Sequence, residues 1–401
     1  MDETLAGKKQ FGAELILALI ITGLVCAAGQ STLLFAPNDM YPMTADAMGH
    51  MAKVRFMADS FSNGIFPAWF PYWYNGTALI QYYPPLSYWV MAPIFMITDN
   101  AMLTFKIDCG MMIFIGGMGI WYFCRSHIGY WCGLIGTFAY CLQPFILRSL
   151  YSAGQLAQGP IIALVPWYIT AMLAYGNKPN SKNFFLCTFL CALMILSHPN
   201  TTFMNCICIM AVFLVFIALK KITFQNYCIM LLTIIFAGTL TAFWSLVGVT
   251  QLENPGVPFL LPEAVAQHTA TIKWFTESSG GWFFFAAPVS IGSIAATLLF
   301  IASVKKLDKD KRYYVLFAII ITYITAIFSF GLNLPFFKYL PMSESLAPGR
   351  ILTLTSASGA ILCAYFIHGV QKASEKKRVI IKIPAYLVCL SAITEIGRAH
   401  V

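Results

Sequence analysis

The amino-acid sequence predicts an all-α fold, a polytopic bundle of about 11–12 membrane-spanning helices. Of its 401 residues, 59% are hydrophobic and only 10% are charged, and the mean hydropathy is +0.73. A soluble domain carries roughly 25% charged residues. A chain of this length could not bury so much apolar surface in a soluble core, so lipid must surround much of it.

Twelve apolar runs are long enough, or nearly long enough, to cross a bilayer, because a helix needs roughly 20 residues to do so. They cover residues 13–35, 78–97, 101–124, 128–147, 156–175, 183–198, 201–219, 227–250, 282–304, 313–331, 350–370 and 379–394. We expect these runs to form a single membrane domain over residues 1–394, with no separate soluble domain.

The basic residues predict the orientation of the chain. They lie in short clusters between apolar runs, so the formal charge of +9 reflects positive cytoplasmic loops and not a nucleic-acid partner. Lys8 and Lys9 place the N-terminus in the cytoplasm and the loop 36–77 outside. If every run from there on crosses the membrane, however, the basic loop around Lys178 falls on the outer side, which contradicts the positive-inside rule. Either one run between residues 78 and 175 re-enters, or two runs form a single span.

The two ends of the chain need separate interpretation. The run 11–35 is too long for the apolar part of a typical signal peptide, so we interpret it as a retained span. Residues 395–401 are the translation of a nucleotide string that, apart from its first base, matches a widely used short-read sequencing adaptor. We therefore expect the natural protein to continue beyond Thr394, and we assign Arg398 and His400 no function. The alternative is a genuine helix end.

The first loop predicts a helix that begins near Thr44, a capping residue, and ends near Ser62, before the stop signal Asn63-Gly64. Its apolar stripe consists of Met48, Met51, Val54, Ala58 and Phe61. Asp46, His50 and Lys53 occupy another face at helical spacing. The pattern indicates an amphipathic helix along the membrane surface. The aromatic residues Trp69, Tyr72, Trp73 and Tyr74 suit the interfacial belt.

Asp46 and His50 are the candidate catalytic residues. In the first turn of a helix, the dipole and the free backbone N–H groups favour an ionised carboxylate. Such a carboxylate can act as a general base on an acceptor hydroxyl, and His50 could orient it or bind a phosphate. The alternative is purely structural: Asp46 stabilises the helix start, and His50 is its partner one turn later.

Short motifs along residues 40–360 resemble those of one family. They are Asp46-x-x-x-His50, Pro67 to Gly76, Tyr82 to Leu86, Arg148 with Gly154-Gln155-Leu156-Ala157, Leu196-Ser197-His198, Ala242-Phe243-Trp244 and Pro348-Gly349-Arg350. Together and in this order they resemble the bacterial and archaeal 6-pyruvoyl-tetrahydropterin-synthase-related membrane proteins. The three-histidine zinc site of the soluble pterin synthase has no counterpart here.

The resemblance implies a GT-C-like glycosyltransferase in a prokaryotic cytoplasmic membrane. Such enzymes pass a sugar from a polyprenyl-phosphate carrier to an extracytoplasmic acceptor, and their hallmark is an acidic residue in the first external loop. Asp46 occupies that place, and Asp39 is the other candidate. For substrate binding, the resemblance points to Tyr82, Tyr83, Arg148 and Arg350. The paired acidic residues of many such transferases are missing, so we expect no divalent metal and no cofactor besides the lipid-linked donor.

Other functions remain open at this stage. Arg350 could bind the carrier phosphate or could be an interfacial arginine that snorkels towards water. The chain could also be a transporter or flippase of a lipid-linked saccharide, or a non-catalytic membrane protein. The sequence contains no Walker motif and no His-Glu-x-x-His, which argues against a nucleotide-driven pump and an intramembrane zinc protease.

Overall fold

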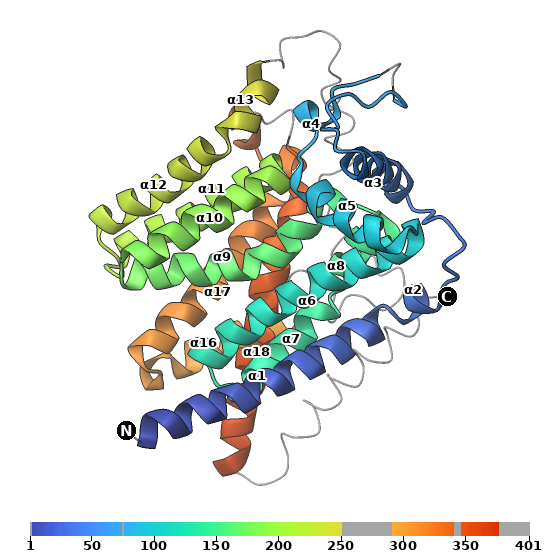
Figure 1. Ribbon diagram of the computed structural model, residues 1–401. Coiled ribbons are helices and arrows are strands. Elements are labelled where there is room, and N and C mark those ends of the chain that lie inside the picture. The colour runs from blue at the N-terminus through green and yellow to red at the C-terminus, as the bar shows by residue number, and fades with distance from the viewer. Residues whose placement is uncertain (1, 74–75, 251–290, 341–345, 377–401) are drawn as a thin grey trace.

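The computed structural model describes residues 2–73, 76–250, 291–340 and 346–376 (Figure 1). Within these residues the regular structure is helical, apart from one isolated bridge between Phe70 and Thr77. The run 379–394, the loop 251–281 and residues 395–401 lie outside the described residues.

The N-terminal half contains the first loop and the first part of the bundle. Its helices are α1 (Asp2–Gly29), α2 (Ser31–Phe35), α3 (Ala47–Ser62), α4 (Leu79–Tyr82), α5 (Leu86–Thr98), α6 (Ala101–His127), α7 (Tyr130–Cys141), α8 (Pro144–Leu147), the π-helical turn η1 (Arg148–Ser152) and the short turn η2 (Leu156–Gln158). α6 packs on α7 and on the helix that follows η2.

The C-terminal half completes the bundle. Its helices are α9 (Gly159–Asn177), α10 (Ser181–Ser197), α11 (Pro199–Ala218), α12 (Phe224–Leu240), α13 (Ala242–Thr250), α16 (Ile291–Ser303), α17 (Lys309–Phe328) and α18 (Leu352–Lys376). Short turns are η3 (Val304–Lys306), η4 (Gly331–Asn333), η5 (Phe337–Tyr339) and η7 (Pro348–Ile351). α18 lies in the interior, against α7, α16 and α17.

The predicted class, an all-α membrane bundle, is confirmed. Six helices in the described part of the chain are long and apolar enough to cross a bilayer, and three shorter apolar helices, α5, α10 and α12, accompany them. A further candidate span bends by 46° between α7 and the segment Phe145–Ser152. Each predicted run within the described residues coincides with at least part of a helix.

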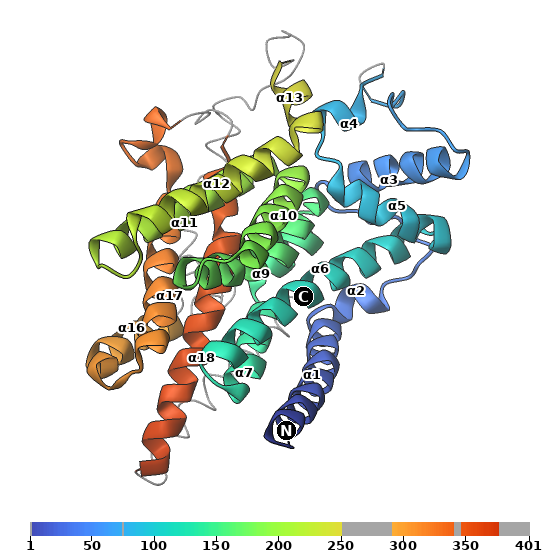
Figure 2. The same ribbon diagram turned by 60° about the vertical axis from the view of Figure 1, so that its left-hand side comes forward.

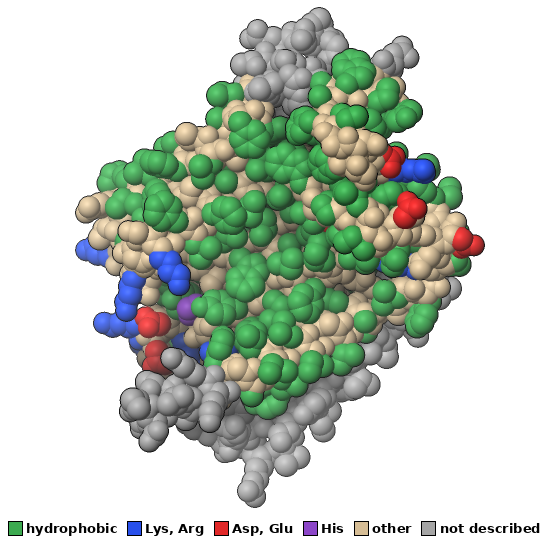
Figure 3. All heavy atoms as spheres, in the orientation of Figure 1, with side chains coloured by type: hydrophobic (Ala, Val, Ile, Leu, Met, Phe, Trp, Pro, Cys, Tyr) green, Lys and Arg blue, Asp and Glu red, His purple; other side chains and the backbone are tan. Residues whose placement is uncertain are grey.

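The two ends of the bundle differ in charge. The N-terminus, the α9–α10, α11–α12 and α16–α17 connections and the last turns of α18 lie towards one end, and α3, α4 and α13 lie at the other (Figures 1 and 2). Most of the visible Lys and Arg side chains gather at the first end (Figure 3). This distribution is what the positive-inside rule requires. The cytoplasmic location of that end remains a prediction.

The run 78–97 does not cross the bundle, which resolves the contradiction with the positive-inside rule. At the start of α5, Tyr83 contacts His50 of the first loop. Just past its other end, the Asn100 side chain donates to the Asn38 carbonyl of the same loop at 2.9 Å. Both ends of the run therefore lie beside the first loop. α6 is then the second crossing, and the Lys178 loop returns to the end that carries the N-terminus.

α3 has the predicted boundaries but different surroundings. The Thr44 hydroxyl accepts the Ala47 N–H at 3.1 Å, and Gly64 ends the helix with φ +68. The stripe residues Met51 and Val54 are buried, and α3 packs along α5. His50 and Lys53, expected on a separate polar face, are also buried, with 5% of each exposed. The location of α3 along a membrane surface remains a prediction.

The topology can be tested by cysteine labelling. We expect Asn63→Cys and Asp99→Cys, both at exposed positions, to react with a membrane-impermeant maleimide added from the same side. Lys178→Cys should react only from the opposite side, because α6, α7 and α9 intervene. Labelling of Asp99→Cys from the Lys178 side would mean that α5 crosses the membrane.

Candidate functional site

The loop 153–158, between η1 and α9, positions the start of α3. The Ala153 carbonyl accepts the Asp46 N–H at 3.0 Å. Gly154 has φ +67, and a Cβ there would overlap the Thr44 hydroxyl and the Ala47 nitrogen. Only glycine combines this conformation with such a close approach. The glycine therefore allows the carboxylate-bearing end of α3 to dock against the bundle.

The same loop also joins three other elements. The Ala157 carbonyl accepts the Ser197 hydroxyl of α10 at 2.7 Å and the Ser87 hydroxyl of α5 at 3.4 Å. The Gln158 amide donates to the Thr353 hydroxyl of α18 at 3.0 Å and reaches the Arg350 carbonyl at 3.5 Å. The loop thus brings Asp46 and Arg350 to the same end of the bundle.

Asp46 lies at the outer edge of a cluster of polar and aromatic side chains. It is the exposed residue that precedes α3, and its side chain makes no capping hydrogen bond. His50, one turn on, is buried, and its Nδ1 lies 2.7 Å from the Tyr88 hydroxyl. The His50 ring meets Tyr83 edge-on, with 5.8 Å between centroids. Neither contact joins the imidazole to the Asp46 carboxylate.

Lys53 is the buried cation of this cluster. Its Nζ lies 4.0 Å from the Trp73 ring centroid and 3.9 Å from that of Tyr83, so two aromatic faces enclose the ammonium. Burial lowers the pKa of Lys53 to about 8, while the Asp46 carboxylate acts in the opposite direction. Burial also raises the pKa of Tyr83, with a further contribution from Asp46. Lys53 is therefore mainly protonated at neutral pH, and Tyr83 keeps its proton.

His50 is neutral at physiological pH. Burial, together with the positive charges of Lys53 and Arg350, lowers its pKa to about 3. A neutral imidazole can exchange hydrogen bonds but adds no charge for a phosphate. The positive charge at this end therefore comes from Lys53 and Arg350.

Arg350 is held by His198. The guanidinium Nη1 donates to His198 Nε2, and His198 Nδ1 lies 3.0 Å from the Thr201 hydroxyl. Arg350 Nε is buried and has no hydrogen-bond partner among the described residues. His198 Nδ1 also accepts the Thr201 N–H at 3.3 Å and thereby caps α11.

The structure brings together only some of the predicted site residues. Asp46, His50, Tyr83 and Arg350 belong to one cluster. Asp39 is exposed in the turn after α2 and Arg148 is exposed on η1, and no hydrogen bond or ion pair within the described residues connects either side chain to the cluster. The Tyr82 side chain lies outside the described part. The roles predicted for all these residues remain predictions.

Sequence reasoning missed several members of the cluster. Lys53 was placed on the helix face of Asp46 and His50 but was given no role. His198 was interpreted only as a helix end, and Gln158 and Tyr88 were not singled out. One signal for a role of Lys53 was available: its spacing from Asp46 places both residues on the same face of α3. Nothing in the sequence signalled that His198 and Arg350 meet.

The donor set around Asp46 does not fit a divalent metal. Lys53 and Arg350 would repel a cation, and His50 Nδ1 is engaged with Tyr88. Among the described residues, no group of three or more His, Cys, Asp and Glu side chains could hold a metal ion. That the protein works without a metal remains a prediction.

Fold and site together define a polytopic helical membrane protein whose polar groups converge at one end of its bundle. The family model described as "6-pyruvoyl-tetrahydropterin synthase related domain; membrane protein" matches residues 80–396, and the chain belongs to this family. The resemblance read from the motifs is thereby confirmed. No curated protein sequence matches the chain.

Solved structures show that the fold is GT-C-like. The archaeal oligosaccharyltransferase AglB from Archaeoglobus fulgidus, in complex with an inhibitory peptide and a dolichol-phosphate, superposes with a TM-score of 0.58 at 12% identity, covering 96% of this chain and 55% of that one. The apo oligosaccharyltransferase of the same organism gives 0.56 at 13% identity, with 96% and 55% covered. The complex of that enzyme with Zn and sulfate gives a TM-score of 0.54 at 13% identity and covers 96% of this chain and 52% of that one. The chain thus spans about half the length of these proteins, and the likeness concerns the fold.

The family motifs, scattered along the sequence, meet at this end of the bundle. The Trp244 indole of the Ala-Phe-Trp motif donates to the Ile80 carbonyl at 2.6 Å, next to the segment that contains Tyr83. The loop 153–158, His198 and Arg350 belong to three further motifs and are in contact through the hydrogen bonds described above. This convergence supports a shared functional site.

The glycine in the central loop can be tested by substitution. We expect Gly154→Ala to lower the free energy of unfolding by more than about 2 kcal/mol, because a left-handed alanine costs 1–2 kcal/mol and its Cβ also overlaps α3. The matched control is Gly49→Ala in α3, where a Cβ meets nothing within 4 Å. Thermal melting in detergent measures both. Equal melting of the two variants would contradict the docking described here.

The buried His50 predicts a pH-dependent stability. Its pKa falls from 6.5 to about 3 on folding, so the folded state binds fewer protons below pH 6.5. Stability should therefore fall by roughly 1.5 kcal/mol between pH 6.5 and pH 5. We expect the melting temperature of His50→Gln to change less over this interval. An identical pH dependence in both proteins would show that His50 is not buried in its neutral form.

Proposed function

We propose that the protein is a GT-C glycosyltransferase that moves a sugar from a polyprenyl-phosphate carrier to an acceptor at the extracytoplasmic face. The observation that carries this proposal is the exposed Asp46 carboxylate beside the buried cations Lys53 and Arg350, in the first loop after α1. A base and positive charge for a leaving phosphate are the two elements that such a transfer needs.

In the proposed reaction, Asp46 accepts the proton of the acceptor hydroxyl. The acceptor oxygen forms a bond to the anomeric carbon, the bond from that carbon to the phosphate oxygen breaks, and the carrier leaves as polyprenyl phosphate. The exposure of Asp46 allows an acceptor to approach from the aqueous side.

Arg350 is the proposed ligand of the leaving phosphate. Its guanidinium is oriented by His198 and retains a buried Nε without a partner among the described residues. A planar guanidinium suits phosphate because it can donate two parallel hydrogen bonds. The arginine is thus oriented before the donor arrives, as electrostatic stabilisation of a leaving group requires.

One comparison supports a lipid-linked donor, and another supports a separate acceptor. One similar structure is a complex with a dolichol-phosphate, and another is tethered to an acceptor peptide. The distribution of charge favours an enzyme over a transporter, since transporters usually place their charged sites near the bilayer midplane on broken helices. Here the charged residues of the site lie at one end of the bundle.

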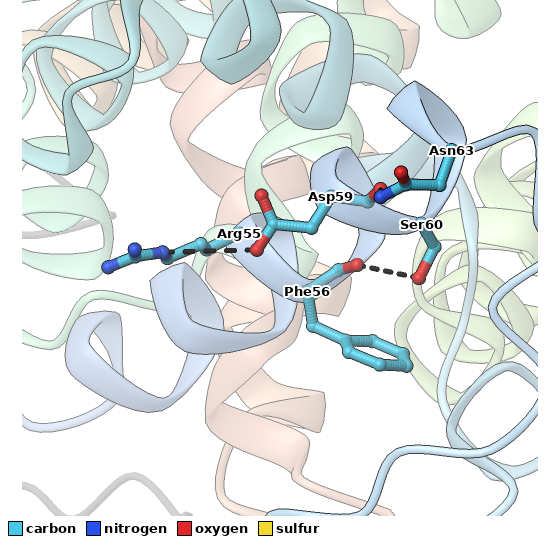
Figure 4. Close-up of polar contacts among 5 residues, drawn as sticks. All are labelled: Arg55, Phe56, Asp59, Ser60 and Asn63. Atoms are coloured by element: carbon cyan, nitrogen blue, oxygen red, sulfur yellow. Dashed lines mark hydrogen bonds and ion pairs between the residues drawn. The ribbon is translucent and has the colours of Figure 1, made fainter.

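The role of Asp46 can be tested by substitution. We expect Asp46→Asn to slow transfer at least about 100-fold, because the variant lacks the general base. Native mass spectrometry of the purified protein, after addition of polyprenyl-phosphate sugars, would follow the conversion of carrier to free polyprenyl phosphate. The matched control is Asp59→Asn: the Asp59 carboxylate is exposed on α3 and lies 4.0 Å from Arg55 (Figure 4).

Asp39→Asn separates the two candidate bases. It should retain activity if Asp46 is the base, and its selective loss of activity would reassign the role to Asp39. If the wild-type protein binds the lipid-linked sugar and never cleaves it, the transferase proposal fails and a transporter of such lipids becomes the better explanation.

A further inference from the structure

We infer that the Lys53 ammonium, enclosed by the rings of Trp73 and Tyr83, is a second phosphate-binding group of the donor site, beside Arg350. The inference rests on the proposed function because it assigns a ligand within the same site. It concerns a residue to which neither the sequence motifs nor the comparisons give a role.

The Lys53 ammonium has no oxygen acceptor among the described residues. A lysine offers three N–H donors, and only 5% of Lys53 is exposed. The contacts of its Nζ are the rings of Trp73 and Tyr83. Ring faces attract the positive charge but supply no oxygen acceptor. The N–H donors of Lys53 are therefore available to an anionic ligand at this site.

No carboxylate of the described residues forms an ion pair with Lys53. The ion pairs of the described residues join Arg55 to Asp59 and Arg125 to Glu14. Asp46 acts on Lys53 electrostatically but is not within ion-pair distance. An ammonium between two rings keeps its full charge, whereas one paired with a carboxylate would present a neutral surface. This arrangement preserves attraction for an anionic ligand.

Tyr83 lies between Lys53 and the other groups of the site. Its ring covers Lys53 on one side and meets the neutral His50 on another, and Arg350 acts on it electrostatically. The two cations therefore lie around one aromatic side chain. With one carboxylate, Asp46, the group carries a net charge of about +1 at neutral pH. This charge complements the single negative charge of a sugar phosphodiester.

The test measures binding of a polyprenyl phosphate to the purified full chain in detergent, without a sugar or an acceptor. We expect Lys53→Met to weaken binding about tenfold or more, because a hydrogen bond between two charged groups contributes that much. Lys53→Arg should retain binding. The matched control, Arg55→Met, removes a cation from the exposed face of α3 (Figure 4) and should bind like the wild type.

The pH dependence distinguishes a phosphate ligand from a structural lysine. Wild-type affinity should fall as the pH rises from 7 to 9, because Lys53 loses its proton near pH 8. The charged or titratable groups that interact with Lys53 are Asp46, His50 and Tyr83. Tyr88 contacts His50, and Arg350 acts on His50 and Tyr83. The His50 pKa is about 3, well below this range. Lys53→Arg should abolish the pH dependence, since arginine stays charged.

The outcomes separate this inference from the proposed function. Equal affinity of Lys53→Met and the wild type, or a wild-type affinity that does not change from pH 7 to pH 9, overturns the role of Lys53 and leaves the transferase proposal intact. If Lys53→Met does not fold, the affinity of Lys53→Arg and the pH dependence of the wild-type affinity still test the role of Lys53. A wild-type protein that binds no polyprenyl phosphate overturns both.

Discussion

The rest of this structure depends on one constraint: where a helix breaks inside the bundle, its backbone N–H and C=O groups must still form hydrogen bonds. Away from water, each freed N–H and C=O needs a partner within the protein. The loop 153–158 meets this demand with groups from other elements: the Asp46 N–H bonds to Ala153, and the Ser197 and Ser87 hydroxyls bond to Ala157. A local break in helical structure thereby becomes the joint at which the first loop, α5, α10 and α18 meet.

The electrostatics of the site follow from this joint. Docking of α3 between the loop and α5 buries His50 and Lys53, although both belong to a helix whose opposite face is exposed. Burial keeps the imidazole neutral and leaves the ammonium stabilised by ring faces instead of a carboxylate. Arg350 reaches the same region from η7 and is oriented by His198. One exposed carboxylate thus lies beside two cations that the fold holds in place, which is an arrangement for anion recognition and proton transfer at an interface.

The boundaries of α3 were predictable because their causes are local. Thr44 caps the first turn, and Asn63-Gly64 permits the left-handed stop. The burial of Lys53 was not predictable, because it depends on Trp73 and Tyr83, which approach from later segments. The course of residues 78–97 was also undecided. Its apolar composition suits a span, and only the contacts at both of its ends with the first loop show that both ends lie on the same side of the bundle.

Composition and the placement of charge determined by themselves that this protein is a helical membrane bundle, because hydrocarbon excludes charges and unpaired backbone wherever they occur in the sequence. Motif order further determined the family. Only the tertiary structure decided which of the candidate residues act together: it joined Asp46, His50, Tyr83 and Arg350, added Lys53 and His198, and left Asp39 and Arg148 apart. The physical reason is that a site made from distant segments depends on helix packing and on the hydrogen bonds of one loop, and neither leaves a periodic signal in the sequence.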